Sequence, residues 1–298
     1  MSIGKKVISS SLLLVAVRFL QRTLGLISTL ILARILIPED FGIVAITAIC
    51  VQFSEVLSNS GIKQYIPQKD EVDHDDLNTA WSIDLSLKFV MWIIVLFGAP
   101  LLADFYDNEK ITSALQVVSI VILLRALQNP GLHLLRRNLS YSKIFWLNLW
   151  QKVASFIVVV VLALTLKSYW AMIIGDIVYA IVGIVGSYHL HSFRPKLSLT
   201  RYKEQLGFSK WMLGRGIVGF FRAQADQLMV SKIFGIGDLG VYNVVRGISV
   251  LPATDIIVPS VEPLLASFAR VKKDIQQLGH QLRASLLMVF LLIMPICA

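Results

Sequence analysis

Residues 12–42 read LLLVAVRFLQRTLGLISTLILARILIPEDFG, and this stretch decides the fold. Its apolar run, Leu12 to Ile37, is long enough to cross a bilayer, because ~20 apolar residues in a helix span the ~30 Å of hydrocarbon. Arg18 and Arg22 lie inside this run. A charge facing lipid at mid-membrane costs at least ~3 kcal/mol, so both arginines are predicted to face protein or water.

The polar and small residues of this run share one side of the predicted helix. They follow steps of three and four, and they are Arg18, Gln21, Arg22, Gly25, Ser28 and Thr29. Residues at those steps lie on one helix face. The first span is therefore predicted to have a lipid side and a cavity side.

The end of this stretch recurs later in the chain. Residues 33–45 read ARILIPEDFGIVA and residues 231–243 read SKIFGIGDLGVYN, at a constant offset of 198 residues. In both copies a basic residue ends one span, a short turn follows, and another span begins. Three aligned pairs carry the match: Arg34 with Lys232, Asp40 with Asp238, and Gly42 with Gly240. We interpret the match as an internal duplication.

The composition of the chain excludes a soluble domain. The 298 residues are 56% hydrophobic and 16% charged, with a mean hydropathy of +0.70, whereas a soluble domain is usually ~25% charged. Cys50 and Cys297 lie in apolar surroundings, which gives neither a disulfide framework nor a cysteine-based metal site. The net charge of +9 could indicate a nucleic-acid partner, but the membrane topology explains it better, and no such partner is expected.

Hydropathy predicts eight complete spans and part of a ninth. They cover residues 12–37, 41–57, 81–102, 111–128, 147–166, 170–188, 211–234 and 239–261, and a last run that begins near 284. Asn129-Pro130-Gly131 ends the fourth span, because proline lacks an N–H donor and restricts the residue before it. A polar loop with an acidic run around His74 is predicted between the second and third spans.

The spans divide into two lobes. Residues 1–188 are predicted to form an N-terminal lobe of six transmembrane helices, residues 189–210 a basic cytoplasmic inter-lobe loop, and residues 211–298 the start of a C-terminal lobe with two to three transmembrane helices. The predicted fold class is all-α, a polytopic transmembrane bundle of two pseudo-symmetric lobes. The chain ends inside an apolar run, so we expect the second lobe to be incomplete here and the chain to be a fragment of a longer protein.

Basic residues predict the orientation. Segments 1–11, 60–79, 131–146, 189–210 and 264–283 together hold 16 Lys and Arg, whereas the alternate turns hold Lys110 and Lys167. Lysine and arginine favour the cytoplasmic side. The amino terminus is therefore predicted to be cytoplasmic, and the opposite side carries only short turns.

Charged residues inside the spans are the candidates for chemistry. In the seventh span Arg215, Gly219, Arg222, Asp226 and Met229 follow helical steps, as the cavity side of the first span does. Arginine pairs with phosphate through two parallel hydrogen bonds and stays charged in a cavity of low dielectric. The predicted substrate-binding residues are therefore Arg18, Gln21, Arg22, Arg215, Arg222, Asp226 and Arg246.

Several of these residues could have a simpler role than substrate binding. Arg222 with Asp226, and likewise Asp84 with Lys88, are four apart and could form ion pairs within one helix. Arg215 could extend to lipid phosphates. Arg18 and Arg22 have no acid three or four residues away, which makes them the best ligand candidates. No catalytic constellation, metal site, phosphate-binding glycine loop or cofactor motif is present.

Six segments together resemble a known family. They are Ala33–Gly42, Ala103–Tyr106, Arg136–Tyr141, Phe208–Trp211, Asp238–Tyr242 and Arg246–Pro252. They resemble the polysaccharide and oligosaccharide flippases of the multidrug/oligosaccharidyl-lipid/polysaccharide exporter superfamily, and most of all its lipopolysaccharide and exopolysaccharide repeat-unit exporters. The resemblance implies two lobes of six helices, and cavity arginines that carry over to Arg18 and Arg22 and, less securely, to Arg222.

The resemblance also implies a function. A transporter of the bacterial inner membrane would flip a polyprenyl-diphosphate-linked oligosaccharide to the outer leaflet by alternating access, among membrane lipids and with glycan polymerase or ligase machinery as an expected partner. One alternative is a cation-coupled drug or metabolite antiporter of the same superfamily, which would rely on an acid such as Glu55, Asp176 or Asp255. The other is a membrane-embedded glycan polymerase or ligase, but the short outer turns lack room for catalytic residues. No enzyme activity is therefore expected.

Overall fold

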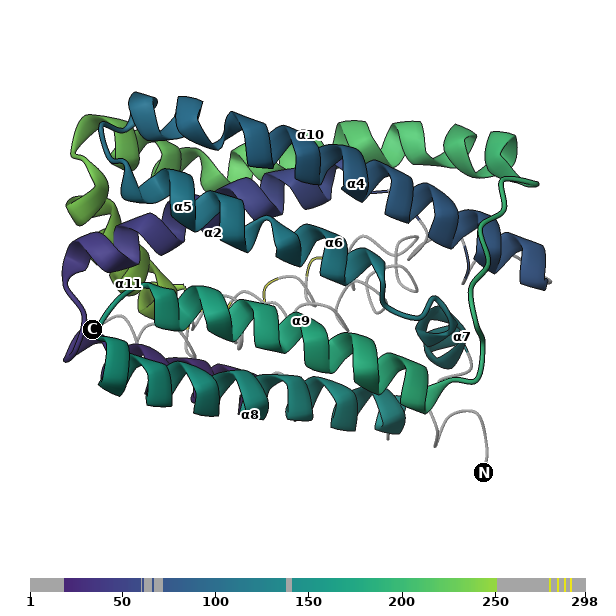
Figure 1. Ribbon diagram of the computed structural model, residues 1–298, viewed down its shortest axis with the longest axis horizontal. Coiled ribbons are helices and arrows are strands. Elements are labelled where there is room, and N and C mark those ends of the chain that lie inside the picture. The colour runs from purple at the N-terminus through teal and green to yellow at the C-terminus, as the bar shows by residue number, and fades with distance from the viewer. Residues whose placement is uncertain are drawn as a thin grey trace. The chain divides into compact units, whose positions relative to one another are not determined.

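The computed structural model describes residues 19–59, 61, 66, 72–137, 141–250, 279, 283, 287 and 290. The chain forms two compact units, residues 1–243 and 244–298, and each is considered by itself. In the first unit every regular element of the described residues is a helix (Figure 1). The all-α class predicted from hydropathy is confirmed, whereas the division into two lobes stays a prediction.

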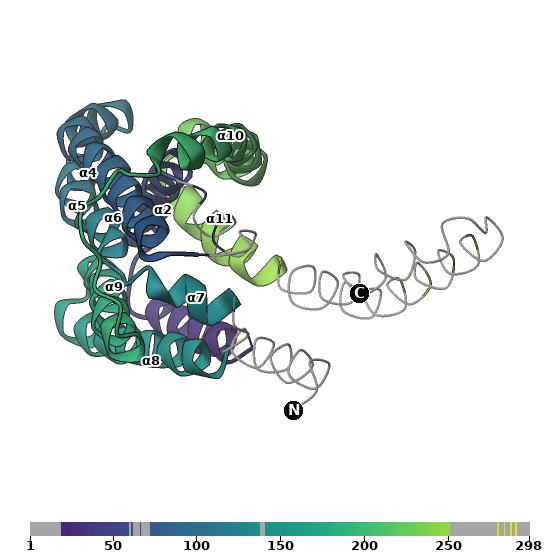
Figure 2. The same cartoon turned by 90° about the vertical axis from the view of Figure 1, so that its right-hand side faces the viewer.

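The helices of the first unit follow the predicted spans. They are an N-terminal helix Phe19–Ala33, α2 (Pro38–Leu57), α4 (His74–Phe105), α5 (Lys110–Val118), α6 (Ile120–Ala126), α7 (Gly131–Arg137), α8 (Tyr141–Leu166), α9 (Trp170–Leu190), α10 (Tyr202–Ile233) and the first part of α11 (Ile236–Ser249). Four of them, α2, α4, α8 and α9, are long and apolar enough to cross a membrane. In Figure 2, α8 and α9 lie on one side of the group formed by α2, α4, α5 and α6, and α10 lies on the other side.

Several predicted boundaries are wrong, because hydropathy places the polar ends of helices in loops. α4 begins at His74 because the Asp73 side chain accepts from the Asp76 N–H, while the Asp76 side chain accepts from the Asp73 N–H. This capping box satisfies helix donors that would otherwise lack partners. Likewise α10 begins at Tyr202, so the connection from α9 covers residues 191–201 rather than the predicted 189–210.

The predicted fourth span consists of two short helices that meet at Ser119. The Ser119 hydroxyl, which is fully buried, donates to the carbonyl of Gln116 at 2.7 Å. A hydroxyl bonded back to its own helix competes with the backbone ladder and bends the helix. The predicted stop at Asn129-Pro130-Gly131 is confirmed, since α6 ends at Ala126.

Glycines bring α8 and α9 close together. A Cβ on Gly175 would meet the side chains of Val159 and Ser155, and one on Gly186 would meet Leu147. Small residues are common where membrane helices pack, because contact area replaces the hydrophobic driving force. The α8–α9 hairpin is therefore a tight pair.

The two copies of the duplicated sequence pack against each other. A Cβ on Gly42 would overlap the carbonyl of Ile236, and a Cβ on Gly240 would overlap the carbonyl of Pro38. Under the offset of 198 residues Pro38 aligns with Ile236 and Gly42 with Gly240. Exchanging the copies therefore converts one contact into the other, which is the behaviour of a local two-fold axis. This reciprocal contact supports the duplication, and we call it the glycine crossing.

Polar bonds join the turns around the glycine crossing. This end of the unit, at the left of Figure 1, is the short-turn end, with turns at 34–37, 106–109, 167–169 and 234–235. Glu39 accepts from the Asn108 side chain at 2.9 Å and forms an ion pair with Lys110. Lys232 donates to the Phe105 carbonyl at 3.2 Å. The end of α10 is therefore fixed to the turn between α4 and α5.

A face of α4 is apolar and yet exposed. Phe97 and Leu101 are 74% and 73% exposed, and Phe89, Val90 and Ile94 are also exposed. Such a continuous apolar face on a long helix fits a bilayer as the solvent. We infer that this face of α4 contacts lipid.

Replacing Phe97 with lysine tests this inference. Leu197, in the connection after α9, is equally exposed at 75%. Phe97→Lys is expected to cost about 3 kcal/mol of membrane insertion, because a charge would enter hydrocarbon, whereas Leu197→Lys should be neutral. The measurement is the membrane-inserted fraction of each variant. Equal insertion of the two variants would contradict a lipid-facing α4.

Candidate functional site

A polar cavity of about 510 Å³ lies inside the first unit. It is bounded by α2, α4, α6, α7, α8 and α9 and by the turn that follows α6. Its volume is in the range of small-molecule pockets, ~300–1,000 Å³. The polar residues of its lining are Gln52, Glu55, Ser58, Asn59, Trp81, Asp84, Lys88, Arg125, Gln128, Asn129, His133, Asn148, Gln151 and Tyr179.

Ion pairs balance the charge of this cavity. Lys88 contacts Asp84 at 2.7 Å within α4, which confirms the pair expected from their spacing. Arg125 of α6 forms an ion pair with Glu55 of α2, which ties two helices together. The Lys88 and Asp84 side chains are only 14% and 19% exposed. Each basic residue of these pairs is therefore already neutralised by an acid.

Asp176 is a third acid near Arg125, although it does not line the cavity. It lies on α9, close enough to Arg125 and to Lys152 of α8 for electrostatic attraction. Arg125 is therefore placed between the acids of α2 and α9. A guanidinium suits such a position, because its several N–H donors can form hydrogen bonds to two carboxylates. We infer that these charges hold α2, α6, α8 and α9 in their relative positions.

Amide side chains make up much of the remaining lining. The side-chain nitrogens of Gln128 and Gln151 both lie against Gly183 of α9, where a Cβ would overlap them. Gln52 accepts from the Gln224 side chain of α10, and Gln224 accepts from Gln227 at 2.7 Å. These amides connect the cavity wall to α10.

Asn129 closes one end of the cavity. Its side chain donates to the carbonyls of His191 and Phe193, at 3.1 and 2.8 Å, and accepts from the Gly131 N–H at 2.9 Å. It is 1% exposed. The pKa of His191 lies below its usual value because the ring is partly removed from water, and because Lys143 and Arg194 are nearby. The turn after α6 is thus fixed to the end of α9.

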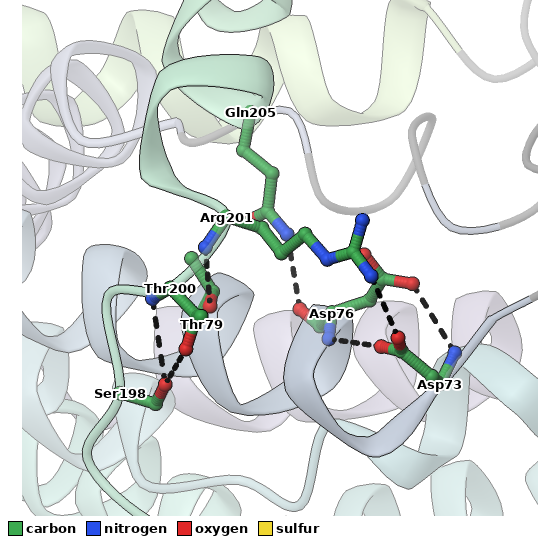
Figure 3. A network of polar contacts seen from close by, with 7 residues as sticks. All are labelled: Asp73, Asp76, Thr79, Ser198, Thr200, Arg201 and Gln205. Atoms are coloured by element: carbon green, nitrogen blue, oxygen red, sulfur yellow. Dashed lines mark hydrogen bonds and ion pairs between the residues drawn. The ribbon is translucent and has the colours of Figure 1, made fainter.

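A second polar network holds the connection that leads to α10. Figure 3 shows Arg201 forming an ion pair with Asp73 at 3.0 Å, and Gln205 donating to the Asp76 carbonyl at 3.0 Å. The Arg201 N–H donates to the Thr79 hydroxyl. The capping box of α4 is therefore also the anchor for the start of α10.

The sequence-predicted site residues lie elsewhere in the first unit. Arg18 falls outside the described residues, and Arg22 is half-buried on the N-terminal helix. Gln21 donates to the Asn148 carbonyl of α8 at 3.3 Å, which is a packing contact. Arg215 and Arg222 of α10 are exposed. None of these described residues lines the polar cavity.

The remaining two candidates are Asp226 and Arg246. Asp226 accepts from the Tyr242 hydroxyl at 2.8 Å, so α10 and α11 are bonded to each other there. Arg246 belongs to the second unit and is half-buried. The binding role predicted for these residues remains a prediction.

Sequence reasoning missed the amides and aromatic residues of the cavity. The sequence prediction included the amide of Gln21 but not those of Gln52, Gln128 and Gln151, although any amide in a membrane span is costly without a partner. Trp81 also lines the cavity, although a tryptophan near the end of a span is more often an interface anchor. Polar residues of any kind in the spans would have been the better signal.

These features define a multi-pass helical membrane protein with a polar cavity among its spans. Residues 31–298 match the family model described as "Polysaccharide biosynthesis protein". The match covers most of the chain, and the chain belongs to this family. No solved structure matches it significantly.

Curated relatives agree with this family. The chain is 24% identical to the lipopolysaccharide biosynthesis protein WzxC of Escherichia coli, over 93% of this chain and 57% of the relative. It is 24% identical to the succinoglycan biosynthesis transport protein ExoT of Rhizobium meliloti, over 89% and 54%, and 18% identical to the teichuronic acid biosynthesis protein TuaB of Bacillus subtilis, over 68% and 43%. The chain thus spans about half the length of the relatives it matches.

Proposed function

We propose that the protein containing this chain is a transporter, not an enzyme, that exports polysaccharide by flipping a polyprenyl-diphosphate-linked oligosaccharide between leaflets. The observation that carries the proposal is the polar cavity, because a polar space among apolar spans can admit a polar cargo that the hydrocarbon of the bilayer would exclude. The names of the relatives, which concern polysaccharide biosynthesis and transport, point in the same direction.

In this mechanism the two lobes move about a fixed midplane site. The diphosphate pairs with Arg18 and Arg22, the lipid tail stays in the bilayer, and the lobes then expose the glycan on the far side. The amino terminus is cytoplasmic and the membrane is the bacterial inner membrane. The half-buried position of Arg22 on a helix packed against α8 is compatible with this role.

Complementation tests the arginines. The full reading frame that contains this chain is expressed in a strain unable to export its surface glycan, and Arg18→Ala/Arg22→Ala is compared with wild type at equal membrane levels. Charge-assisted hydrogen bonds are worth ~1.5–3 kcal/mol each, so export should fall at least ~100-fold when two arginines are lost.

Arg34→Ala is the matched control. Arg34 is an exposed arginine at the end of the same helix, and export by this variant should equal that of wild type. Normal export by the double variant would refute the role of the arginines. Absence of rescue by wild type, together with a gain of drug resistance, would favour the antiporter instead.

A further inference from the structure

The polar cavity has a chemistry that differs from that of an anion site. Its four charged side chains, Glu55, Asp84, Lys88 and Arg125, form two ion pairs. An anion that bound Lys88 would displace a carboxylate held at 2.7 Å. The anion would have to compete with that carboxylate for Lys88, and separating a partly buried ion pair is unfavourable. The cavity therefore gives no advantage to a charged ligand.

The rest of the lining suits hydroxyl groups. Each amide offers both donors and an acceptor, as a sugar hydroxyl does. Gln128 and Gln151 are held side by side over Gly183, and Asn59 and Asn148 face the same space. A ligand with many hydroxyls could replace its hydrogen bonds to water with hydrogen bonds to these amides, and it would need no formal charge to do so.

Two aromatic residues complete this lining. Trp81 of α4 and Tyr179 of α9 both border the cavity. Among the described residues the Trp81 indole N–H has no hydrogen-bond acceptor, although it is buried. A buried donor without an acceptor is costly unless water or a ligand satisfies it. Aromatic faces also pack well against the apolar faces of sugar rings.

We propose that this cavity binds the uncharged, hydroxyl-rich sugar rings of the cargo and not its diphosphate. The inference rests on the proposed function, because it assigns one part of the lipid-linked glycan to one site. It assigns the amides and Trp81 to sugar recognition, and it leaves the phosphates to groups outside the cavity.

Binding to the purified full chain in lipid nanodiscs tests this assignment. The probes are a panel of neutral hexose oligosaccharides, the matched uronic-acid oligosaccharides, and inorganic pyrophosphate. A neutral oligosaccharide should bind more tightly than its acidic counterpart. Trp81→Phe and Gln151→Leu should each weaken the binding of the neutral oligosaccharide about tenfold, because each removes one hydrogen-bonding group. Gln116→Leu is the control, since Gln116 lies on the exposed side of α5 and its replacement should leave this binding unchanged.

A charge variant gives an independent readout. Glu55→Gln removes the acid paired with Arg125, so it should create an affinity for the uronic-acid probe that wild type lacks. Preference of wild type for the acidic probe, or loss of pyrophosphate binding in Trp81→Phe, would overturn the inference. If no neutral sugar binds while complementation succeeds, the inference is also overturned, but the proposed function stays intact. Failure of complementation with sugar binding retained would instead refute the transport proposal.

Discussion

Replacing Gly240 with alanine is expected to destabilise the protein strongly. The added Cβ would overlap the carbonyl of Pro38 and the backbone nitrogen of Gly42, and backbone atoms cannot rotate away as a side chain can. Overpacking of this kind costs ~1–3 kcal/mol or more. The melting temperature of the detergent-purified protein should therefore fall by on the order of 5 °C.

The two-fold character of the glycine crossing gives a sharper form of this prediction. Gly42→Ala should cost about as much as Gly240→Ala, and the double variant should cost less than the two added together, because both changes separate the same pair of helix ends. Gly219→Ala is the control, since no atom lies within 4 Å of its Cβ position on α10. A melting temperature of Gly240→Ala equal to that of Gly219→Ala would show that the crossing does not exist.

Asn129→Ala is expected to have the second large effect. The substitution leaves the Gly131 N–H without its present partner, in a place that is 1% exposed. It also removes one of two donors from the carbonyls of His191 and Phe193, which still accept from the Arg194 guanidinium. Each unsatisfied buried group costs ~1–3 kcal/mol. The free energy of unfolding should thus decrease by about 2 kcal/mol, which a denaturation curve in mild detergent would measure.

Asn108→Ala is the matched control for this substitution. Asn108 also bonds within its own turn and donates to Glu39, but it is only half-buried. Its replacement should cost less than ~1 kcal/mol, because water can take over the lost bonds. Hydrogen exchange should accelerate around residues 127–131 and 191–193 in Asn129→Ala alone. Equal losses for the two asparagines would contradict the role of Asn129 as a buried junction.

The helices of the first unit could be predicted because their main signal is local. An apolar run of about 20 residues specifies a membrane helix almost regardless of its neighbours. Helix ends were harder to predict, since hydropathy ignores capping. Asp73 and Asp76 are a capping signature in the sequence, whereas hydropathy alone predicts a polar loop around them.

The polar cavity could not be predicted, for a different reason. Glu55, Asp84, Lys88 and Asp176 are charged residues inside the predicted spans, and the spacing of Asp84 and Lys88 predicted their pairing. Arg125 and Glu55, however, lie 70 residues apart. Their pairing depends on how α2 and α6 pack, which periodicity does not contain. The glycine crossing is an intermediate case, because the duplication predicted equivalent residues but not their contact.

The length of α4 affects the network at its beginning. Its 32 residues rise about 48 Å, whereas the hydrocarbon of a bilayer is ~30 Å thick. Because the lipid-facing residues from Phe89 onward occupy the later half, the turn that carries Asp73 extends into the aqueous phase. The attraction between Asp73 and Arg201 should therefore weaken with ionic strength. Changes in lipid chain length, by contrast, should leave this anchor of α10 unaffected.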